Sequence, residues 1–316
     1  MGAGFRRPDL PATMTALPLA IDRLTKRFGR LTAVEDLTLS IEPGEIFGFL
    51  GLNGAGKTTT IRMVLDLLRP TAGRARIFGL DSRVNGRAAR ALVGYLPGEN
   101  PFYDDMTGGA TLDLLGRLNG RPPDDARRRR LLDRFALGAR DLTRQLREYS
   151  TGMKRKLGLV QAFQHDPPLV ILDEPSEGLD PMMQEALYAL LDDMRRDGRT
   201  VFLSSHVLPE VERVCDRIGL LRAGRLALVS TVAEVQHLAP RRVTVVFGGD
   251  VAAARLVAPA GCETIAAAPR AWTLTVSGPL GPLLEVLAGL PIADLEVSEP
   301  HIEDVLVRYY REGGTP

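Results

Sequence analysis

The segment Gly51–Thr59 combines glycines, one lysine and adjacent threonines in an order suited to binding phosphate. Its fixed positions match the pattern G-x-x-x-x-G-K-[ST]. The glycines permit positive φ angles and close approach, so that consecutive backbone N–H groups can converge on phosphate oxygens. Lys57 supplies a charge for the β- and γ-phosphates, and Thr58 offers a hydroxyl to Mg²⁺. The sequence therefore predicts a nucleoside triphosphate site built from Asn53, Gly54, Ala55, Gly56, Lys57, Thr58 and Thr59.

Two adjacent carboxylates follow the continuous apolar run Leu169–Leu172. Such a run is typical of a central parallel strand that is covered on both faces. Asp173, at the end of this strand, can hold Mg²⁺ together with Thr58, directly or through water. Glu174 points elsewhere and can polarise a water molecule. An acidic pair at a strand end is more often a solvated turn, but a phosphate loop in the same chain favours the functional interpretation.

Three other residues occupy positions suited to nucleotide chemistry. His206 is the one histidine of four that follows a predicted core strand, Thr200–Ser204. Ligands of α/β proteins gather at the carboxyl ends of strands, which favours function over the commoner structural role. Phe28 precedes a glycine in a polar turn and either covers the rim of the core or stacks on a nucleobase. Ser150 is a natural N-cap for the helix that follows it.

The elements around these residues predict an α/β fold. The phosphate loop joins a predicted strand, Gly44–Leu50, to a helix, Thr60–Leu68, whose apolar residues recur at helical spacing. Residues 98–165 show several helical patterns and no persuasive strand, so a helical insertion is expected there. Further strands are expected at Leu19–Leu24, Leu37–Ile41, Arg74–Phe78 and Val93–Leu96, with a polar turn at Thr25–Arg30 and a helix at Met182–Arg196.

The chain after residue 240 is expected to form a separate, small domain. Strands are expected at Val243–Phe247, Cys262–Ile265, Trp272–Val276 and Leu295–Val297, and helices at Val251–Val257, Pro282–Leu290 and His301–Tyr310. The order β-α-β-β-α-β predicts a small ferredoxin-like module, for which docking or support of a dimer is the favoured role. We therefore expect a flexible leader at 1–17, a nucleotide-binding domain at 18–238 with its helical subdomain at about 98–165, and an accessory domain at 239–316.

Composition excludes several functional classes. The chain has 316 residues and a formal net charge of +1, which gives no field for nucleic acid. Cys215 and Cys262 match no metal-ligand spacing and indicate a reducing compartment. No window reaches the length of about 18 apolar residues that a membrane helix needs. Work at a membrane would therefore require a partner.

Taken together, these residues resemble the ATP-binding subunit of an ABC transporter, over about residues 19–235. The resemblance identifies Gly51–Thr58 as the Walker A motif, Leu169–Asp173 as Walker B and Ser176–Asp180 as the D-loop. It implies ATP and Mg²⁺ as cofactors and an α/β phosphate-loop core of ABC type. It also implies roles for individual residues: Glu174 as catalytic glutamate, His206 as switch histidine, Lys57 as phosphate ligand and Phe28 as the aromatic that stacks on adenine.

Two segments depart from the family pattern. The signature segment, usually Leu-Ser-Gly-Gly-Gln, is Tyr149-Ser150-Thr151-Gly152-Met153 here, so that Ser150 and the second glycine, Gly152, are kept. The family also places a glutamine after the strand that corresponds to Val93–Leu96, where it contacts Mg²⁺ and the attacking water. This chain has Gly98 at that position. The ATPase assignment survives, but that contact is in doubt.

The subfamily and its partners also follow from resemblance. Lys26–Gly29, Tyr149–Lys154 and Ile302–Leu306 resemble bacterial ABC-2 exporters, which include drug-resistance ATPases. This implies a homodimer around two ATP, in which Ser150 and Gly152 of one subunit complete the other's site. It further implies efflux of a small molecule or lipid through separate transmembrane permease subunits, with this chain on the cytoplasmic face of the membrane. An importer ATPase and a soluble, non-transport ABC ATPase are the alternatives.

Overall fold

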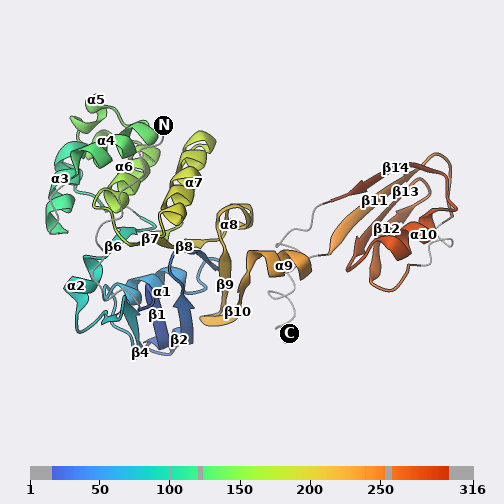
Figure 1. Ribbon diagram of the computed structural model, residues 1–316, viewed down its shortest axis with the longest axis horizontal. Helices are drawn as coiled ribbons and strands as arrows, with labels where there is room; N and C mark the ends of the chain where they lie inside the picture. Colours follow the sequence, from blue (N-terminus) through green and yellow to red (C-terminus); the bar gives the residue numbers. More distant parts are fainter. Residues whose placement is uncertain (1–15, 100, 120–123, 239, 253–257, 299–316) are drawn as a thin grey trace. The chain divides into compact units, whose positions relative to one another are not determined.

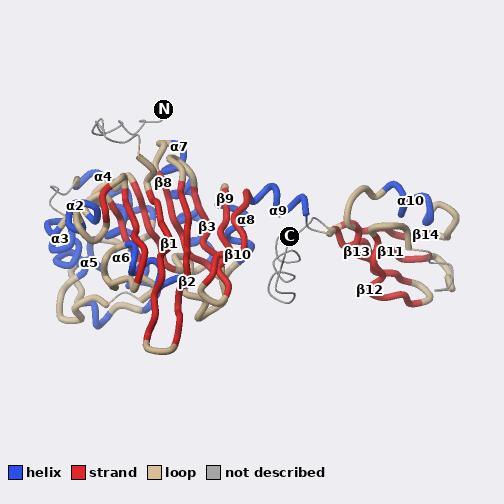
Figure 2. Tube along the Cα trace, turned by 90° about the horizontal axis from the view of Figure 1, so that it is seen from below, coloured by secondary structure: helices blue, strands red, loops and turns tan. Residues whose placement is uncertain are grey.

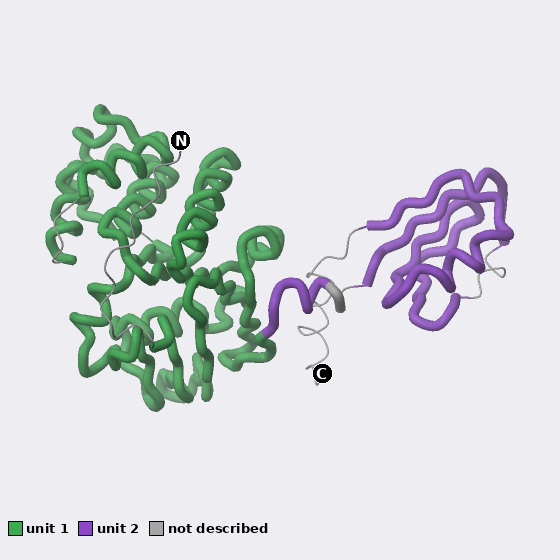
Figure 3. The backbone as a smooth tube through the Cα atoms, viewed as in Figure 1, with its two compact units in different colours: residues 1–229 green, residues 230–316 purple. Residues whose placement is uncertain are grey.

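A computed structural model describes residues 16–99, 101–119, 124–238, 240–252 and 258–298 of the chain. The chain divides into two compact units, and the division falls between Val229 and Ser230 (Figure 3). This division precedes the predicted boundary at 238, because α9 (Val232–Leu238) groups with the second unit. The expected leader at 1–17 lies, except for its last two residues, outside the described residues.

A six-stranded sheet in unit 1 brings together the strand ends that carry the predicted site (Figure 1). Its order is β10 (Arg225–Thr231), β9 (Arg217–Arg222), β3 (Ile46–Leu50), β8 (Thr200–Ser205), β7 (Leu169–Asp173) and β6 (Val93–Leu96). The strands from β9 to β6 are parallel, and their register pairs Leu50 with Ser205 and Asp173 with Ser204. All residues of β3, β7 and β8 are buried, as their apolar runs predict. The segments that follow these three strands therefore meet at one edge of the sheet.

A second, antiparallel sheet in unit 1 has the order β2-β1-β4-β5. Its strands are β1 (Leu19–Phe28), β2 (Leu31–Ile41), β4 (Ala72–Ile77) and β5 (Leu80–Asp81). The predicted polar turn at Thr25–Arg30 is wrong in extent, because β1 continues to Phe28 and pairs Arg27 with Thr32. Only Gly29, at a φ of 56°, and Arg30 form the turn. Pairing across the hairpin has outweighed the polar character of the sequence.

The helix α1 (Lys57–Val64) joins the two sheets through one shared core. The core combines Leu37 and Ile77 of the antiparallel sheet, Phe49 and Phe202 of the parallel sheet, and Ile61 and Met63 of α1. The rings of Phe49 and Phe202 lie 5.3 Å apart. Removal of one such buried ring costs about 3–5 kcal/mol. This packing fixes the helix whose first residue is Lys57. The helix ends earlier than the predicted Leu68, and Asp66 follows it with a φ of 55°.

Helices dominate the segment between β6 and β7, as predicted for residues 98–165. Among the described residues of this segment, the only β pairing is an isolated bridge between Thr107 and Gln145. The helices are α3 (Gly108–Leu118), α4 (Asp125–Arg134), α5 (Ala139–Leu142) and α6 (Thr151–Phe163), and three more, α2 (Gly86–Arg90), α7 (Pro181–Arg196) and α8 (Leu208–Val214), lie elsewhere in unit 1. Ser150 caps α6 as predicted, since its hydroxyl accepts a hydrogen bond from the Met153 N–H at 3.2 Å.

Unit 2 contains an antiparallel sheet with α10 (Gly281–Leu287) beside it (Figure 2). Its order is β12 (Cys262–Ala268), β13 (Ala271–Val276), β11 (Arg241–Phe247) and β14 (Ile292–Val297), with antiparallel pairing between all neighbours. Trp272 is fully buried and stacks edge-on against Phe247 at 4.7 Å. The helix predicted at Val251–Val257 is not present at its first two residues, and its remainder lies outside the described residues, as does the helix predicted at His301–Tyr310.

Candidate functional site

The loops that follow β3, β6 and β7 surround an open cleft of about 880 Å³. Its lining includes most of the phosphate-binding segment: Asn53, Gly54, Gly56, Lys57, Thr58 and Thr59. Asp173 and Glu174 line it from the end of β7, and Gly98 and Glu99 from the segment after β6. The structure therefore brings the predicted phosphate and metal residues together in one cleft.

The phosphate-binding segment needs glycine at two points where another residue would collide. A Cβ on Gly56 would stand 2.6 Å from the Ala33 carbonyl oxygen, and Gly56 itself has a φ of 111°. A Cβ on Gly51 would stand 2.6 Å from the Leu221 carbonyl oxygen, although the φ of Gly51 is not positive. These contacts hold the loop against β2 and β9 and place the amino end of α1 in the cleft. A helix amino end with free N–H groups attracts phosphate.

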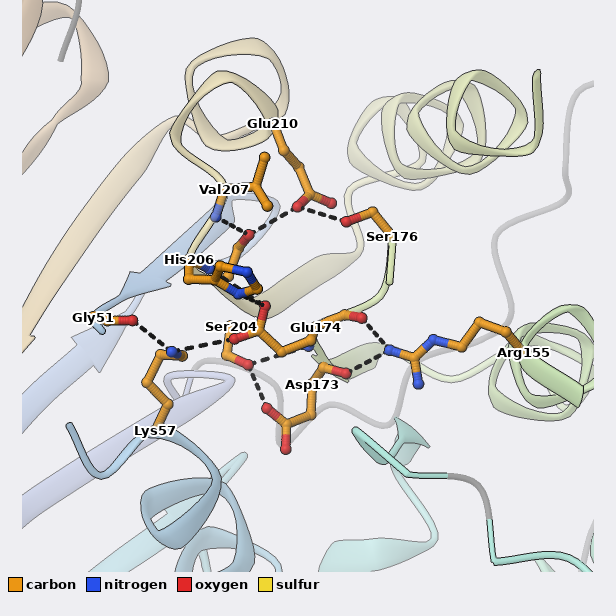
Figure 4. A network of polar contacts seen from close by, with 11 residues as sticks. Gly51, Lys57, Arg155, Asp173, Glu174, Ser176, Ser204, His206, Val207 and Glu210 are labelled. Carbon is orange, nitrogen blue, oxygen red and sulfur yellow. Dashed lines mark hydrogen bonds and ion pairs between the residues drawn. The ribbon is translucent and has the colours of Figure 1, made fainter. Parts of the chain in front are cut away.

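Lys57, Glu174 and His206 form a continuous polar chain, whose first two members line the cleft (Figure 4). The Lys57 Nζ donates to the Gly51 carbonyl oxygen at 2.5 Å and lies 3.2 Å from Glu174 Oε1. The other carboxylate oxygen, Oε2, lies 2.8 Å from His206 Nδ1 and accepts from the His206 N–H at 3.3 Å. Glu174 has a φ of 51°, a strained value for a residue with a side chain. The backbone thus turns sharply between Asp173 and Pro175 and sends the two adjacent carboxylates in different directions.

Asp173 is fully buried, and only one of its two carboxylate oxygens accepts a hydrogen bond. Its Oδ1 accepts a hydrogen bond from Ser204 Oγ at 2.5 Å. Its Oδ2 has no hydrogen-bond partner among the described residues. Thr58 lines the same cleft, so a hydroxyl and an orphaned carboxylate oxygen are available to a hard cation. The donor set fits Mg²⁺. The Cβ of any residue replacing Gly98 would lie 3.5 Å from this Oδ2.

Arg155 on α6 is a central residue of the site that the sequence reasoning missed. Its guanidinium donates to carbonyl oxygens of Asp173 and Glu174 and to others nearby (Figure 4). Burial lowers the pKa of Arg155, and the charges of Glu177 and Asp173 oppose that effect. One signal was available in the sequence. Arg155 falls one turn before the apolar residues Gly158 and Leu159, on the face of α6 that is buried.

A second missed group links the segments that carry Glu174 and His206. Glu210 on α8 is 3% exposed, and its Oε2 accepts hydrogen bonds from Ser176 Oγ at 2.9 Å and Ser205 Oγ at 2.8 Å. Burial raises the pKa of Glu210, and the two hydroxyl hydrogen bonds partly offset the rise. Ser176 follows Glu174 by two residues, and Ser205 directly precedes His206. Glu210 therefore fixes the D-loop relative to the histidine.

Five predicted site residues do not line the cleft of their own chain. Two of them adjoin residues that do: Ala55 lies within the phosphate-binding segment, and His206 contacts Glu174. Ser150 and Gly152 are also absent from the lining of the cleft, although Thr151 and Lys154 belong to it. Gly152 lies against the D-loop, where an added Cβ would be 3.0 Å from the Gly178 carbonyl oxygen. Phe28 is 48% exposed at the end of β1, with Lys26 Nζ 4.9 Å from its ring centroid. Ser150, Gly152 and Phe28 remain candidates for contacts that this chain alone does not complete.

A phosphate-binding loop between a strand and α1, with two carboxylates at the end of another parallel strand of the same sheet, defines a phosphate-loop NTPase. The sequence adds the family, because a model described as "ABC transporter" matches residues 34–177. The daunorubicin resistance ATP-binding protein DrrA3 of Streptomyces coeruleorubidus is 34% identical, with 93% of each chain covered. The Nod factor export ATP-binding protein I of Ralstonia nicotianae is 34% identical over 81% of this chain and 80% of its own length. This chain belongs to the ATP-binding proteins of ABC transporters, and the resemblance predicted from its motifs is confirmed.

Solved structures agree with this assignment. An ATP-binding subunit of an ABC transporter is 32% identical and superposes with a TM-score of 0.65, over 70% of this chain and 92% of that one. A dimeric ATP-binding cassette in a post-hydrolysis state, bound to ADP and Pi, shares the fold with a TM-score of 0.62 at 21% identity, over 68% of this chain and 98% of that one. The chain is therefore an ABC-type ATPase. No helix in its described part is both long and apolar enough to cross a membrane.

Proposed function

We propose that this chain is the ATP-hydrolysing subunit of an ABC exporter, which works as a homodimer on separate transmembrane permease subunits. The observation that carries the proposal is the polar chain Lys57–Glu174–His206 beside the orphaned Asp173 oxygen. It supplies a cation for phosphate, a carboxylate for water and a donor that orients the carboxylate. Relatives whose names describe daunorubicin resistance and Nod factor export favour efflux over import.

In this proposal each residue of the cleft has one task in hydrolysis. ATP takes Lys57 away from Glu174, because the β- and γ-phosphates offer more negative charge. Glu174, held by His206, then accepts a proton from the water that attacks the γ-phosphate. Backbone N–H groups of Asn53–Thr59 hold the phosphates, and Phe28 stacks on adenine. Thr58 and Asp173 would hold Mg²⁺, which neutralises phosphate charge when bound.

Ser150 and Gly152 act in the partner's site. Their absence from the lining of their own cleft, and the position of Gly152 beside the D-loop, support this assignment. The test mixes Ser150→Arg subunits with Lys57→Ala subunits, since a mixed dimer retains one intact composite site. We expect each variant alone to be inactive and ATPase activity to return on mixing. Lack of recovery in heterodimers that are shown to form would refute the shared site.

A groove of about 290 Å³ near the cleft is the proposed seat of the permease. Its lining includes Leu65 just after α1, Tyr95 of β6, Leu115 of α3, and Pro101 and Phe102. Burial raises the pKa of Tyr95 to about 12, so its hydroxyl stays neutral. An apolar helix turn of a membrane subunit suits this lining. Because only two residues separate Gly98 from Pro101, movement at the cleft reaches the groove, and Phe102→Ala should abolish transport but leave basal hydrolysis intact.

The remaining expectations concern placement and the accessory unit. An ATPase docked on a permease in this way would lie on the cytoplasmic face of the membrane. The antiparallel order β12-β13-β11-β14 supports assigning the ferredoxin-like fold to unit 2, since that fold places its strands in this order. Purification of the complex from membranes tests the function as a whole. Co-purification of a permease, and ATP-driven efflux that Glu174→Gln abolishes, are the expected results; inward transport would support the importer alternative.

A further inference from the structure

The guanidinium of Arg155 uses all its donors on backbone carbonyls. Arginine has five N–H groups in a planar fork. Nε donates to Pro175 O at 3.3 Å, Nη1 to Pro97 O at 2.7 Å and Gly98 O at 3.0 Å, and Nη2 to Asp173 O at 2.7 Å and to Glu174 O. The side chain is only 3% exposed. Among the ion pairs found between described residues, none includes Arg155. A buried cation is therefore satisfied by carbonyls alone.

These carbonyls belong to two segments that line the cleft. One is the turn after β6, where Gly98 faces the free oxygen of Asp173. The other is the turn after β7, which carries Asp173 and Glu174. Any shift of either segment on ATP binding or hydrolysis changes the positions of the acceptors around Arg155. The planar fork has no spare donor with which to absorb such a shift.

The other end of the contact is the amino end of α6. Arg155 lies little more than one turn after the cap residue Ser150, and Gly152 lies between them. Helix geometry is stiff over one turn, so a displacement of the Arg155 side chain is passed to the signature segment Tyr149–Met153. Buried polar networks of this kind fix one arrangement because every alternative leaves a polar group unsatisfied.

We propose that Arg155 is a positioning residue that couples the two ATP sites of the dimer. It links the carbonyls around the γ-phosphate of its own site to Ser150 and Gly152, which complete the partner's site. The proposal rests on the shared sites argued above. A misplacement of about 1 Å at a reacting centre can cost a factor of 10² in rate. Loss of the Arg155 fork should therefore lower hydrolysis in both sites, at least tenfold in each.

The first test is Arg155→Lys, which keeps the charge but replaces five fixed donors by three mobile ones. The matched control is Arg199→Lys, because Arg199 is also buried and donates to the carbonyls of Asp166 and Pro167, away from the cleft. For Arg155→Lys we expect ATP affinity of the monomer within about threefold of wild type and a fall in kcat. The control should leave both unchanged.

Two kinds of mixed dimer measure the effect of Arg155→Lys on each ATP site separately. With a Ser150→Arg partner, the one complete site has the partner's Glu174 and the Ser150 of the Arg155→Lys subunit. With a Glu174→Gln partner, the one active site has the Glu174 of the Arg155→Lys subunit and the partner's Ser150. We expect at least a tenfold loss in each, relative to the same dimers with Arg155 intact. Normal activity with the Ser150→Arg partner would overturn the coupling and leave Arg155 a local support.

The reference dimers distinguish failure of the coupling from failure of the proposed function. If they are inactive although Arg155 is intact, the shared site is refuted and the coupling with it. If Arg155→Lys does not fold, as judged by thermal unfolding, hydrogen exchange in the Ser150→Arg chain replaces it. ATP should then alter protection of the amides of four residues that do not line the cleft of their own chain: Gly152, Met153, Lys156 and Leu157. Unchanged protection would overturn the proposal.

Discussion

Replacement of Glu174 by glutamine should separate ATP binding from ATP hydrolysis. The change keeps the shape of the side chain and removes its charge. Since the carboxylate is the proposed acceptor of the water's proton, hydrolysis should fall by about 10²–10⁴. An ATP-bound dimer should accumulate, because the step that dissolves it is blocked. Phosphate release and size-exclusion chromatography with ATP measure the two effects.

The ion pair with Lys57 adds a second, opposite effect on affinity. The 3.2 Å separation of Lys57 Nζ and Glu174 Oε1 corresponds to an attraction of about 5 kcal/mol at an effective dielectric constant of about 20. The two side chains are 7% and 15% exposed, so solvent screens the pair only weakly. ATP must compete with this attraction for Lys57. Even about a quarter of it, released in the variant, corresponds to tenfold tighter ATP binding.

Titration with a fluorescent ATP analogue therefore gives the sharper test. Glu174→Gln should bind the nucleotide at least tenfold more tightly than wild type, and Lys57→Ala should lose binding. The variant should also melt at a lower temperature without ATP, because Lys57 is then buried without its carboxylate partner. Turnover near that of wild type would remove Glu174 from its catalytic role. Unchanged affinity together with lost turnover would refute the competition for Lys57.

Further substitutions test the edges of the site. Phe28→Ala should weaken ATP binding by about 5- to 150-fold, from a stacking energy of roughly 1–3 kcal/mol per base, with kcat unchanged in steady-state assays. Glu99→Ala should leave basal hydrolysis within a few-fold of wild type; a loss as large as that of Glu174→Gln would show that Glu99 replaces the family's glutamine. Gly98→Gln should fold normally, because its Cβ would meet Asp173 at 3.5 Å, an ordinary contact, and Mg²⁺ titration of ATPase activity should show tighter metal binding. Burial raises the pKa of Glu210 above its ordinary value of 4.5, so the stability it contributes is complete below that value and is lost as the pH rises through the folded-state pKa. The melting temperature of Glu210→Gln relative to wild type should therefore increase as the pH is raised from about 5, and a constant difference would contradict the burial argument.

The sequence predicted those parts of the site whose positions depend on neighbouring residues in the chain. The phosphate-binding segment lies within one strand-loop-helix unit, so its residue spacing almost determines its shape. Asp173, Glu174 and His206 follow buried parallel strands, and the shared edge of the sheet brings such residues together. The antiparallel hairpin was predicted less well, because cross-strand pairing extended β1 to Phe28 through residues of polar character.

The contacts of Arg155 and Glu210 depend on packing between distant segments. Arg155 donates to the carbonyls of Pro97 and Glu174. Glu210 accepts a hydrogen bond from Ser176, the first residue of the D-loop. Every residue has a backbone carbonyl, so a sequence motif cannot identify which carbonyls a buried side chain will contact. What the sequence does show is a charged residue on the apolar face of each helix. A charge that is buried must find partners, and that rule marks both residues as candidates from their helical spacing alone.

Gly98 is linked to Arg155 through its backbone, at the position where the family pattern has a glutamine side chain. In the family pattern a glutamine side chain after β6 senses the metal and the attacking water. Gly98 has no side chain, but its carbonyl oxygen accepts from Arg155 Nη1 at 3.0 Å, and its Cα faces the free oxygen of Asp173. The coupling proposed above requires a donor that is fixed in space and reaches both strand ends, and Arg155 donates to the carbonyls of both Gly98 and Asp173. Pro101 and Phe102 lie three and four positions after Gly98 and line the groove, so in our two proposals the same segment connects the cleft, the signature segment and the permease seat without the glutamine.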